Sequence, residues 1–250
     1  MKNGLDPLKE FLSRNGVNIG NNHSEQVVIN DETFENQLML IVKFHDSCRG
    51  YIPKMWNKIP DKRGSLIQQF KNKQKIAYQY ISELKGEKKK STFEEFLLDN
   101  ISGFFAKTQN LYYIAQHEKY NNLLKRCMER EEICIGNSCF SNLWQNKGIH
   151  YGTLNRCCLD MYENDVFFLI SRTKIKGSVL NWEKLINIYC KEEKLDHFSE
   201  EYIKCLLDYP YDYIKYAIKY FTNKKFYNES ISWEKEKKYM NKIKIEMKST

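Results

Sequence analysis

The sequence predicts a mainly helical protein, and its composition and patterning support this fold class. Only 11 of the 250 residues are Gly and 4 are Pro, which is few for the many tight turns of a sheet-rich protein. Hydrophobic residues make up 42% of the chain and aromatic residues 14%, so the chain can bury a core. Apolar side chains recur at helical spacing along most of the length. The length fits one large domain or two small ones.

The first elements are predicted from caps and from apolar spacing. A short helix is expected at Leu5–Arg14, and Gln26–Ile29 is the early strand candidate. Thr33 can cap a helix that ends at His45. A longer helix is expected over Leu66–Leu84.

The middle of the chain is expected to be helical around one small hairpin. Lys85–Lys90 contains no apolar residue and is predicted to be a solvated connector, and a capping-box pattern opens a helical stretch over Ser91–Arg130. Within residues 143–154, Asn146-Lys-Gly148 interrupts two short apolar runs, which is typical of a β-hairpin. Later helices are expected at Asn164–Ser171, Trp182–Lys191, Ser199–Asp208 and Tyr211–Phe221, before a basic helix from Trp233.

The net charge of +8 raises the question of nucleic-acid binding, because a basic field attracts phosphate. Only 7 of the 40 basic residues are Arg, the side chain suited to bidentate recognition of phosphate and guanine. The lysines accompany many Asn, Ile and Tyr residues, a bias that an AT-rich genome produces without selection for binding. The composition therefore argues against nucleic acid as a partner. Lysine-mediated binding of nucleic acid or of another anionic polymer is kept as a third candidate function, after the two given at the end of this section.

The chain contains no recognisable targeting or membrane-spanning segment. No apolar region follows Met1 as in a signal peptide, and no apolar run approaches the roughly 18 residues of a membrane span. We therefore expect synthesis in the cytosol, where the eight cysteines stay free at first. A hairpin would bring Cys134 and Cys139 near Cys157 and Cys158, but this spacing suits zinc poorly. Buried thiols are favoured over a metal site, and no metal is predicted.

Several local strings, taken in order, resemble a known family. They are Leu40–His45 followed by Gly50-Tyr51, then Tyr120–Leu124, Ile133–Asn142, Asn164–Phe168 and Leu207–Pro210. From about Phe34 to Trp233 the chain resembles the C-terminal lobe of the CotS-like spore-coat family, which is itself similar to aminoglycoside and choline kinases.

The resemblance implies a protein-kinase-like C-terminal lobe with a small β-hairpin and with the N-terminal lobe largely absent. It divides the chain into a short N-terminal segment at 1–33, a helical lower-lobe domain at 34–233 and a basic helix or tail at 234–250. Residues 1–33 are too few for a five-stranded upper lobe, and they contain no G-x-G-x-x-G loop that would cover ATP phosphates.

The resemblance also assigns positions to the chemistry of the family. Phosphoryl transfer on this fold uses an Asp as proton acceptor and an Asn and a second Asp as Mg²⁺ ligands. Here Ile135 replaces the preceding His, Asn137 replaces the proton acceptor, and Thr153 replaces the metal-binding Asp; Asn142 alone is kept. An amide is not a base, and a lone hydroxyl is a weak Mg²⁺ ligand. We therefore expect no catalytic residue and no cofactor, with Asn142 a vestigial nucleotide contact or, like Asn137, a turn residue.

These positions lead to an expected function. The chain is predicted to be a non-catalytic, pseudokinase-like structural or interaction protein of the bacterial spore coat, and not an enzyme. Its expected partners are other coat proteins, met through an exposed aromatic patch at the vacant upper-lobe face or along Tyr209–Tyr220. The alternative is a residual small-molecule phosphotransferase of the aminoglycoside or choline type, or a nucleotide-binding protein. His45 is expected to cap or pack rather than to act as a base.

Overall fold

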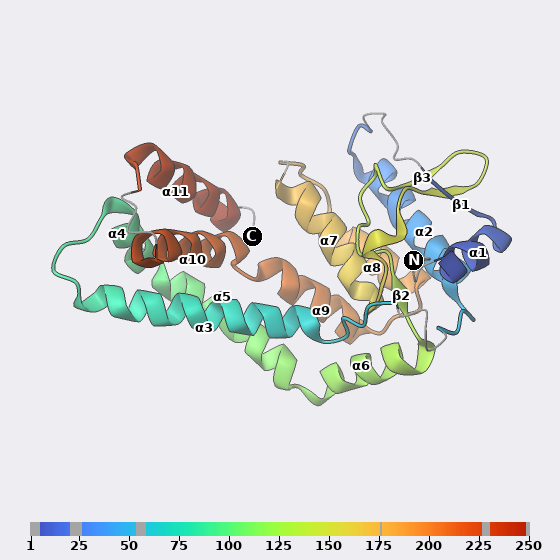
Figure 1. The fold of residues 1–250 in the computed structure, drawn as a ribbon, viewed down its shortest axis with the longest axis horizontal. Coiled ribbons are helices and arrows are strands. Elements are labelled where there is room, and N and C mark those ends of the chain that lie inside the picture. The colour runs from blue at the N-terminus through green and yellow to red at the C-terminus, as the bar shows by residue number, and fades with distance from the viewer. Residues whose placement is uncertain (1–5, 21–26, 54–58, 176, 227–230, 249–250) are drawn as a thin grey trace. The chain divides into compact units, whose positions relative to one another are not determined.

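The computed structural model describes residues 6–20, 27–53, 59–175, 177–226 and 231–248 (Figure 1). The chain forms two compact units, each built from two separate stretches of sequence. Unit 1 comprises residues 1–64 and 117–207, and unit 2 comprises residues 65–116 and 208–250. The mainly helical fold class is confirmed, because eleven α-helices and five short strands make up the described part of the chain.

Unit 1 contains all of the described strands and six of the described helices. The helices are α1 (Asp6–Arg14), α2 (Asp31–Cys48), α6 (Glu118–Arg130), α7 (Tyr162–Ile175), α8 (Trp182–Glu192) and α9 (His197–Asp208), with a 3-10 turn at Leu154–Arg156. The strands are β1 (Val17–Ile19), β2 (Ile133–Cys134), β3 (Leu143–Gln145), β4 (Ile149–Tyr151) and β5 (Cys158–Leu159). The helices predicted before Arg14 and around residues 164–171, 182–191 and 199–208 are confirmed within one turn or two at their ends.

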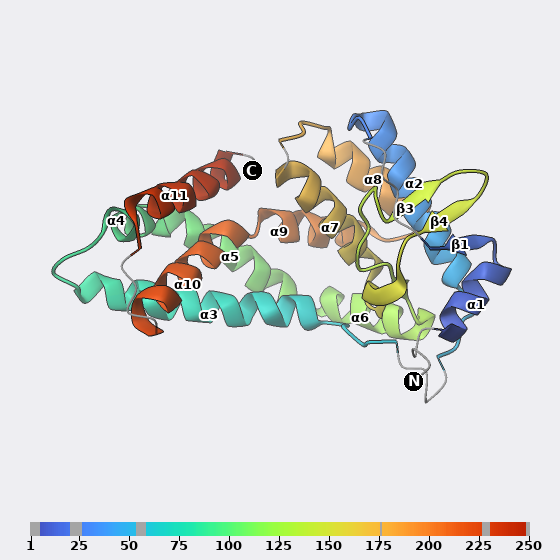
Figure 2. The same cartoon turned by 45° about the horizontal axis from the view of Figure 1, so that its top comes forward.

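The predicted hairpin is present and forms part of a larger sheet. Strands β3 and β4 pair antiparallel, and β1 adds to β4 in parallel, with Val17 opposite Ile149 (Figure 2). The early strand is therefore Val17–Ile19, and the prediction at Gln26–Ile29 is wrong for residues 27–29; Gln26 lies outside the described residues. The reason is burial: Val17, in the strand paired with β4, is 1% exposed, whereas Val28 is 77% exposed.

Helix α2 begins one turn earlier than its sequence predicts. Asn30 is the N-cap, because its Oδ1 accepts the backbone N–H of Thr33 at 2.8 Å. Thr33 completes the capping box by accepting the backbone N–H of Asn30 through Oγ1 at 3.0 Å. The helix also continues past His45 to Cys48, and Gly50 then turns the chain with a φ of +82°. The apolar face of α2 packs against the hairpin strands, which positions the site described below.

Unit 2 is helical throughout its described residues. It contains α3 (Ser65–Gly86), α4 (Thr92–Asp99), α5 (Ile101–Gln116), α10 (Tyr211–Phe226) and α11 (Trp233–Lys248). Helix α3 packs along α10, and α11 packs on α4 (Figure 1). The capping box at Ser91 is confirmed. The predicted helical stretch over Ser91–Arg130 is interrupted at Asn100, the C-cap of α4, and at His117, the N-cap of α6.

A buried ionic cluster joins three segments of unit 1. The Arg126 guanidinium, on α6, donates from Nε to Glu132 Oε1 at 2.9 Å and from Nη2 to Glu163 Oε2 at 2.8 Å. Both glutamate side chains are 0% exposed, so a single Arg provides the charge that two desolvated carboxylates require. Burial raises the pKa of Glu132, and Arg126 opposes that shift. The same guanidinium contacts Ser199 Oγ at 3.3 Å, which adds α9 to the cluster.

We predict that Arg126→Gln lowers the free energy of unfolding by about 3 kcal/mol or more, because it leaves two buried carboxylates without a cation. Arg130→Gln is the matched control, since Arg130 is an exposed residue of the same helix. The control should stay within about 0.5 kcal/mol of the wild type in urea unfolding. Equal losses for the two variants would contradict the role assigned to Arg126.

Candidate loop site

The candidate site is the loop at residues 135–142, which follows β2 and corresponds to the catalytic loop in the family resemblance. Asp165 on α7 anchors its start: Oδ2 accepts the backbone N–H of Ile135 at 2.6 Å, and Oδ1 accepts that of Gly136 at 2.8 Å. Ser138 Oγ donates to the backbone oxygen of Asp165 at 2.6 Å. Tyr151 donates its hydroxyl to the backbone oxygen of Ile135 at 2.8 Å. The loop backbone is thus fixed by side chains from α7 and β4.

Glycine is required at position 136. Its φ is +64°, in the left-handed region that favours glycine. A Cβ at this position would lie 2.1 Å from the backbone oxygen of Arg156, which is closer than any real contact. The loop therefore passes directly against the 3-10 turn.

His45 lies between two buried carboxylates behind this loop. Its Nε2 is 3.0 Å from Asp165 Oδ2, and its Nδ1 is 3.2 Å from Glu193 Oε2. The imidazole is 0% exposed and stacks on the Tyr162 ring at 3.9 Å between centroids. Arg49 Nη2 approaches the other oxygen of Glu193 at 3.3 Å. This geometry agrees with the predicted packing role of His45.

The surroundings of His45 determine its charge. Burial lowers the pKa of the imidazole, and the charges and hydrogen bonds of Glu193 and Asp165 outweigh burial, raising the pKa to about 9. Both ring nitrogens then donate, one to each carboxylate. His45 is therefore an imidazolium at neutral pH, and a cation already bound to both carboxylates is not a general base.

The resemblance places four residues of this chain at catalytic-loop and metal-binding positions of the family, and the structure joins the side chains or backbones of three of them by hydrogen bonds. Asn142 Nδ2 donates to the backbone oxygen of Asn137 at 2.9 Å, and Asn142 Oδ1 accepts the backbone N–H of Thr153 at 3.1 Å. Asn137 Oδ1 accepts a hydrogen bond from Arg172 Nη1. Thr153 Oγ1 accepts the backbone N–H of Asn155 at 3.3 Å. Ile135, the fourth, is buried at 0% exposure and contributes its backbone.

These residues do not fit Mg²⁺. Magnesium prefers carboxylate and other hard oxygen ligands in octahedral geometry, and residues 135–142 contain no carboxylate. Asn142 Oδ1 is already an acceptor for Thr153, and the Asp165 carboxylate already accepts two backbone N–H groups and His45. The vestigial nucleotide contact suggested for Asn142 stays a prediction.

The cysteines come partly together, as the hairpin suggested. Cys134 and Cys158 lie opposite each other in the β2–β5 pair, and all eight cysteines are free thiols. His45, Cys134 and Asp165 offer ligand atoms within 4.8 Å of one another. The Cys134 thiol contacts the backbone oxygens of Asp160 and Met161 at 3.2 Å, and burial raises its pKa. The group is a hydrogen-bonded core cluster, because its ligand atoms are already bound to protein and its thiol is not ionised.

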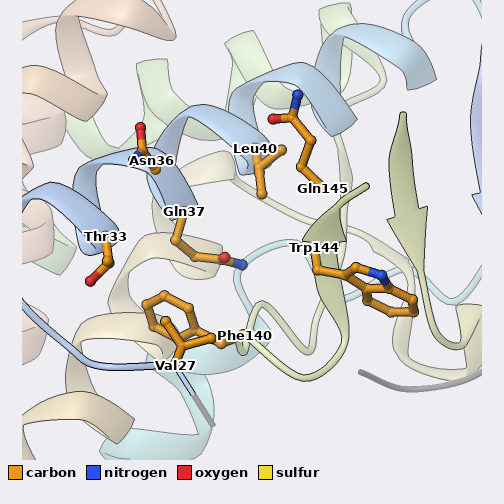
Figure 3. Close-up of a pocket in the computed structure, with 8 residues that line it drawn as sticks. All are labelled: Val27, Thr33, Asn36, Gln37, Leu40, Phe140, Trp144 and Gln145. Carbon is orange, nitrogen blue, oxygen red and sulfur yellow. The ribbon is translucent and has the colours of Figure 1, made fainter. Parts of the chain in front are cut away.

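A shallow pocket of about 230 Å³ lies beside the loop (Figure 3). Its lining comes from the segment before α2, from α2, from the loop itself through Phe140, and from β3: Val27, Thr33, Asn36, Gln37, Leu40, Phe140, Trp144 and Gln145. In Figure 3 the Gln37 side chain extends between Phe140 and Trp144. Gln37 Nε2 donates to the backbone oxygen of Leu143 at 3.0 Å, and Thr33 Oγ1 donates to that of Val28 at 2.8 Å. Two polar side chains of the lining therefore already form hydrogen bonds to backbone oxygens of the pocket walls.

Comparison with known proteins identifies the fold. No protein-family model matches the chain, and no curated protein matches it in sequence. A solved structure matches: the aminoglycoside phosphotransferase from Alicyclobacillus acidocaldarius subsp. acidocaldarius DSM 446, with a TM-score of 0.70 over 98% of this chain and 78% of that chain. The fold is aminoglycoside phosphotransferase-like. The sequence identity is 11%, so the similarity shows the fold alone.

This similarity corrects one prediction and leaves others as predictions. From Asn137 and Thr153 the sequence predicted that the chain is not an enzyme. That prediction is contradicted, because the solved structure with the same fold is an aminoglycoside phosphotransferase. The kinase-like fold with a small hairpin is confirmed. The largely absent N-terminal lobe and the boundaries at 1–33, 34–233 and 234–250 stay predictions. Among the described residues no helix is both long and apolar enough to cross a bilayer.

Two features of the site were missed by sequence reasoning. Glu193 follows a helix of ordinary amphipathic pattern, and nothing in its neighbours marks it as a buried partner of His45. Arg126 lies in a polar helix where one more basic residue is unremarkable. A detectable signal was the excess of ionisable residues inside otherwise apolar strings, such as His45 after Phe44 and Asp165 before Val166.

We predict that His45→Gln lowers the free energy of unfolding by about 3 kcal/mol near pH 6, because it removes the cation between two buried carboxylates. The pKa of His45 is about 9 in the folded chain against 6.5 for the unfolded side chain. Its contribution to stability is therefore complete below about pH 6.5 and is lost as the pH rises through 9. The difference in the free energy of unfolding between wild type and variant, measured in urea, should therefore become smaller as the pH rises from about 6.5 to 9.

His197→Gln is the matched control, because the His197 side chain is 78% exposed. The control should change stability by less than about 0.5 kcal/mol at every pH. A His45→Gln variant as stable as the wild type at pH 6, or a difference that widens towards pH 9, would refute the assigned charge.

Proposed function

We propose that this aminoglycoside phosphotransferase-like chain acts as a structural or interaction component of the bacterial spore coat, with other coat proteins as partners. The observation that supports this proposal is the state of the loop at residues 135–142. The side chains of Asn137 and Asn142 and the carboxylate of Asp165 are all bound within the protein. A loop held in this way presents a fixed surface, which suits a role in assembly.

The spore-coat assignment itself comes from the family resemblance of the local strings between Phe34 and Trp233. Those strings coincide with the elements that form the core of unit 1: Leu40–His45 lies in α2, and Asn164–Phe168 lies in α7. The resemblance therefore falls on the residues that determine the shape of the unit, which supports a function exerted through shape and surface.

The test is localisation during sporulation. A fluorescently tagged copy expressed in a sporulating bacterium should form a ring at the spore surface and should be enriched in detergent-extracted coat material. A tagged cytosolic protein of similar mass is the control for trapping during fractionation. Recovery of the tagged chain from the vegetative cytosol alone would remove the spore-coat assignment.

A second candidate is a small-molecule phosphotransferase, and the observation that favours it is the fold match to an aminoglycoside phosphotransferase. This candidate predicts saturable ADP release from Mg-ATP with an aminoglycoside, choline or a sugar, and a loss of about tenfold or more with Asn142→Ala. Ser141→Ala, an exposed neighbour in the same loop, should leave the rate unchanged. Release no greater than the buffer blank across the panel would eliminate this candidate.

A further inference from the structure

The positive charge of the chain is concentrated in unit 2. That unit contains 18 Lys residues, no Arg and 11 acidic residues, which gives +7 of the net charge of +8. All seven Arg residues lie in unit 1, where basic and acidic residues nearly balance. The charge asymmetry follows the structural units and not the order of the sequence, because unit 2 is assembled from two separate stretches.

A row of alternating ammonium groups and aromatic rings crosses three helices of unit 2. We name it the Lys–Tyr ladder, and its members are Lys73 on α3, Tyr211, Lys215, Tyr216 and Lys219 on α10, and Tyr239 on α11. Lys73 and Lys215 lie over the Tyr211 ring at 5.4 and 5.6 Å from its centroid. Lys215 also lies 4.9 Å from the centroid of Tyr216.

The ladder continues from α10 to α11 through two stacked rings. The centroids of Tyr216 and Tyr239 are 4.7 Å apart, and Lys219 lies over the Tyr239 ring at 5.9 Å. Glu246 on α11 fixes this arrangement by accepting the backbone N–H groups of Asp212 and Tyr213 at 2.7 and 3.1 Å. The lysines are therefore held by rings and by a defined helix packing, which reduces the entropy lost on binding a partner.

The charge on the ladder is available to a partner. Within the part of the chain that the structure describes, neither Lys73 nor Lys219 forms an ion pair, and Lys215 is 3.7 Å from Asp212 with its side chain 46% exposed. Tyr211 is 39% exposed. A cation over an aromatic ring keeps its full charge, because the ring quadrupole does not neutralise it.

The chemistry of the ladder favours carboxylates over nucleic acid. Binding of a single strand requires open ring faces on which bases stack, but the ring faces of Tyr211 and Tyr216 already meet ammonium groups, and Tyr216 also stacks on Tyr239. Unit 2 has no Arg for bidentate contact with phosphate or guanine. Lysine ammonium groups, in contrast, pair with carboxylates as point charges.

We propose that the Lys–Tyr ladder is a docking surface for an acidic protein segment rich in Asp and Glu. This inference deepens the proposed function, because it names the chemistry of a partner in assembly. Its test uses purified components, so it can fail while the spore-coat localisation holds, and the reverse is equally possible.

The experiment measures binding of a fluorescent poly-glutamate peptide of about 20 residues to the full chain by anisotropy at low and physiological salt. A poly-glutamine peptide of the same length and a dT oligonucleotide of similar length are the comparison probes. The ladder variant is Lys73→Gln, Lys215→Gln and Lys219→Gln together. The matched control is Lys9→Gln, Lys43→Gln and Lys184→Gln, three exposed lysines of unit 1 with the same change of charge. Thermal unfolding of each variant checks that it is folded.

We expect the poly-glutamate peptide to bind more tightly than poly-glutamine. The ladder variant should weaken binding by about tenfold or more, and the control by less than about twofold. Tyr211→Leu should also weaken binding although it leaves the net charge unchanged, because it removes the ring that holds Lys73 and Lys215. Absence of binding, or equal losses in the two triple variants, would overturn the proposal. Tighter binding of the oligonucleotide, lost in the ladder variant, would replace the acidic protein with nucleic acid.

Discussion

The ionic contact between His45 and the carboxylates of Asp165 and Glu193 is the constraint on which unit 1 depends. It lies with the side chains at 1% exposure or less and joins α2, α7 and the end of α8. The same Asp165 carboxylate holds the backbone of Ile135 and Gly136. A charged group this deeply buried is costly unless every partner is in place. The position of the loop is therefore coupled to the packing of three helices.

Arg126 repeats this arrangement with the same charges, since one cation again serves two buried carboxylates, here those of Glu132 and Glu163. Glu132 lies next to β2, and α7 contains both Glu163 and Asp165. The two clusters thus contact α7 within its first turn and fix the strand that leads into the loop. Buried networks of this kind tolerate few substitutions, because a partly satisfied network is less stable than an apolar core.

Much of the fold follows from local sequence patterns, and the features that the sequence did not predict have physical causes. The helices and the hairpin were predictable from apolar spacing, the Ser91 capping box and the turn at Asn146–Gly148, because each depends on neighbouring residues. Strand β1 was not, since its partner lies about 130 residues away at β4. Burial of Glu193 and Arg126 depends on tertiary packing in the same way. Asn137 and Thr153 were found from sequence, but the conclusion drawn from them, that the chain is not an enzyme, is contradicted by the similarity of its fold to an aminoglycoside phosphotransferase.

The measurement that most directly tests this account is the titration of the His45 imidazole by NMR in the full-length chain. Comparison with the His45→Gln spectrum assigns the signal among the five histidines. The account predicts that His45 stays protonated through neutral pH and titrates at about 9, above its ordinary value of 6.5. A midpoint at or below 6.5 would show that the imidazole is neutral between its carboxylates, and it would contradict the ionic centre on which the loop, the helix packing and the proposed surface role depend.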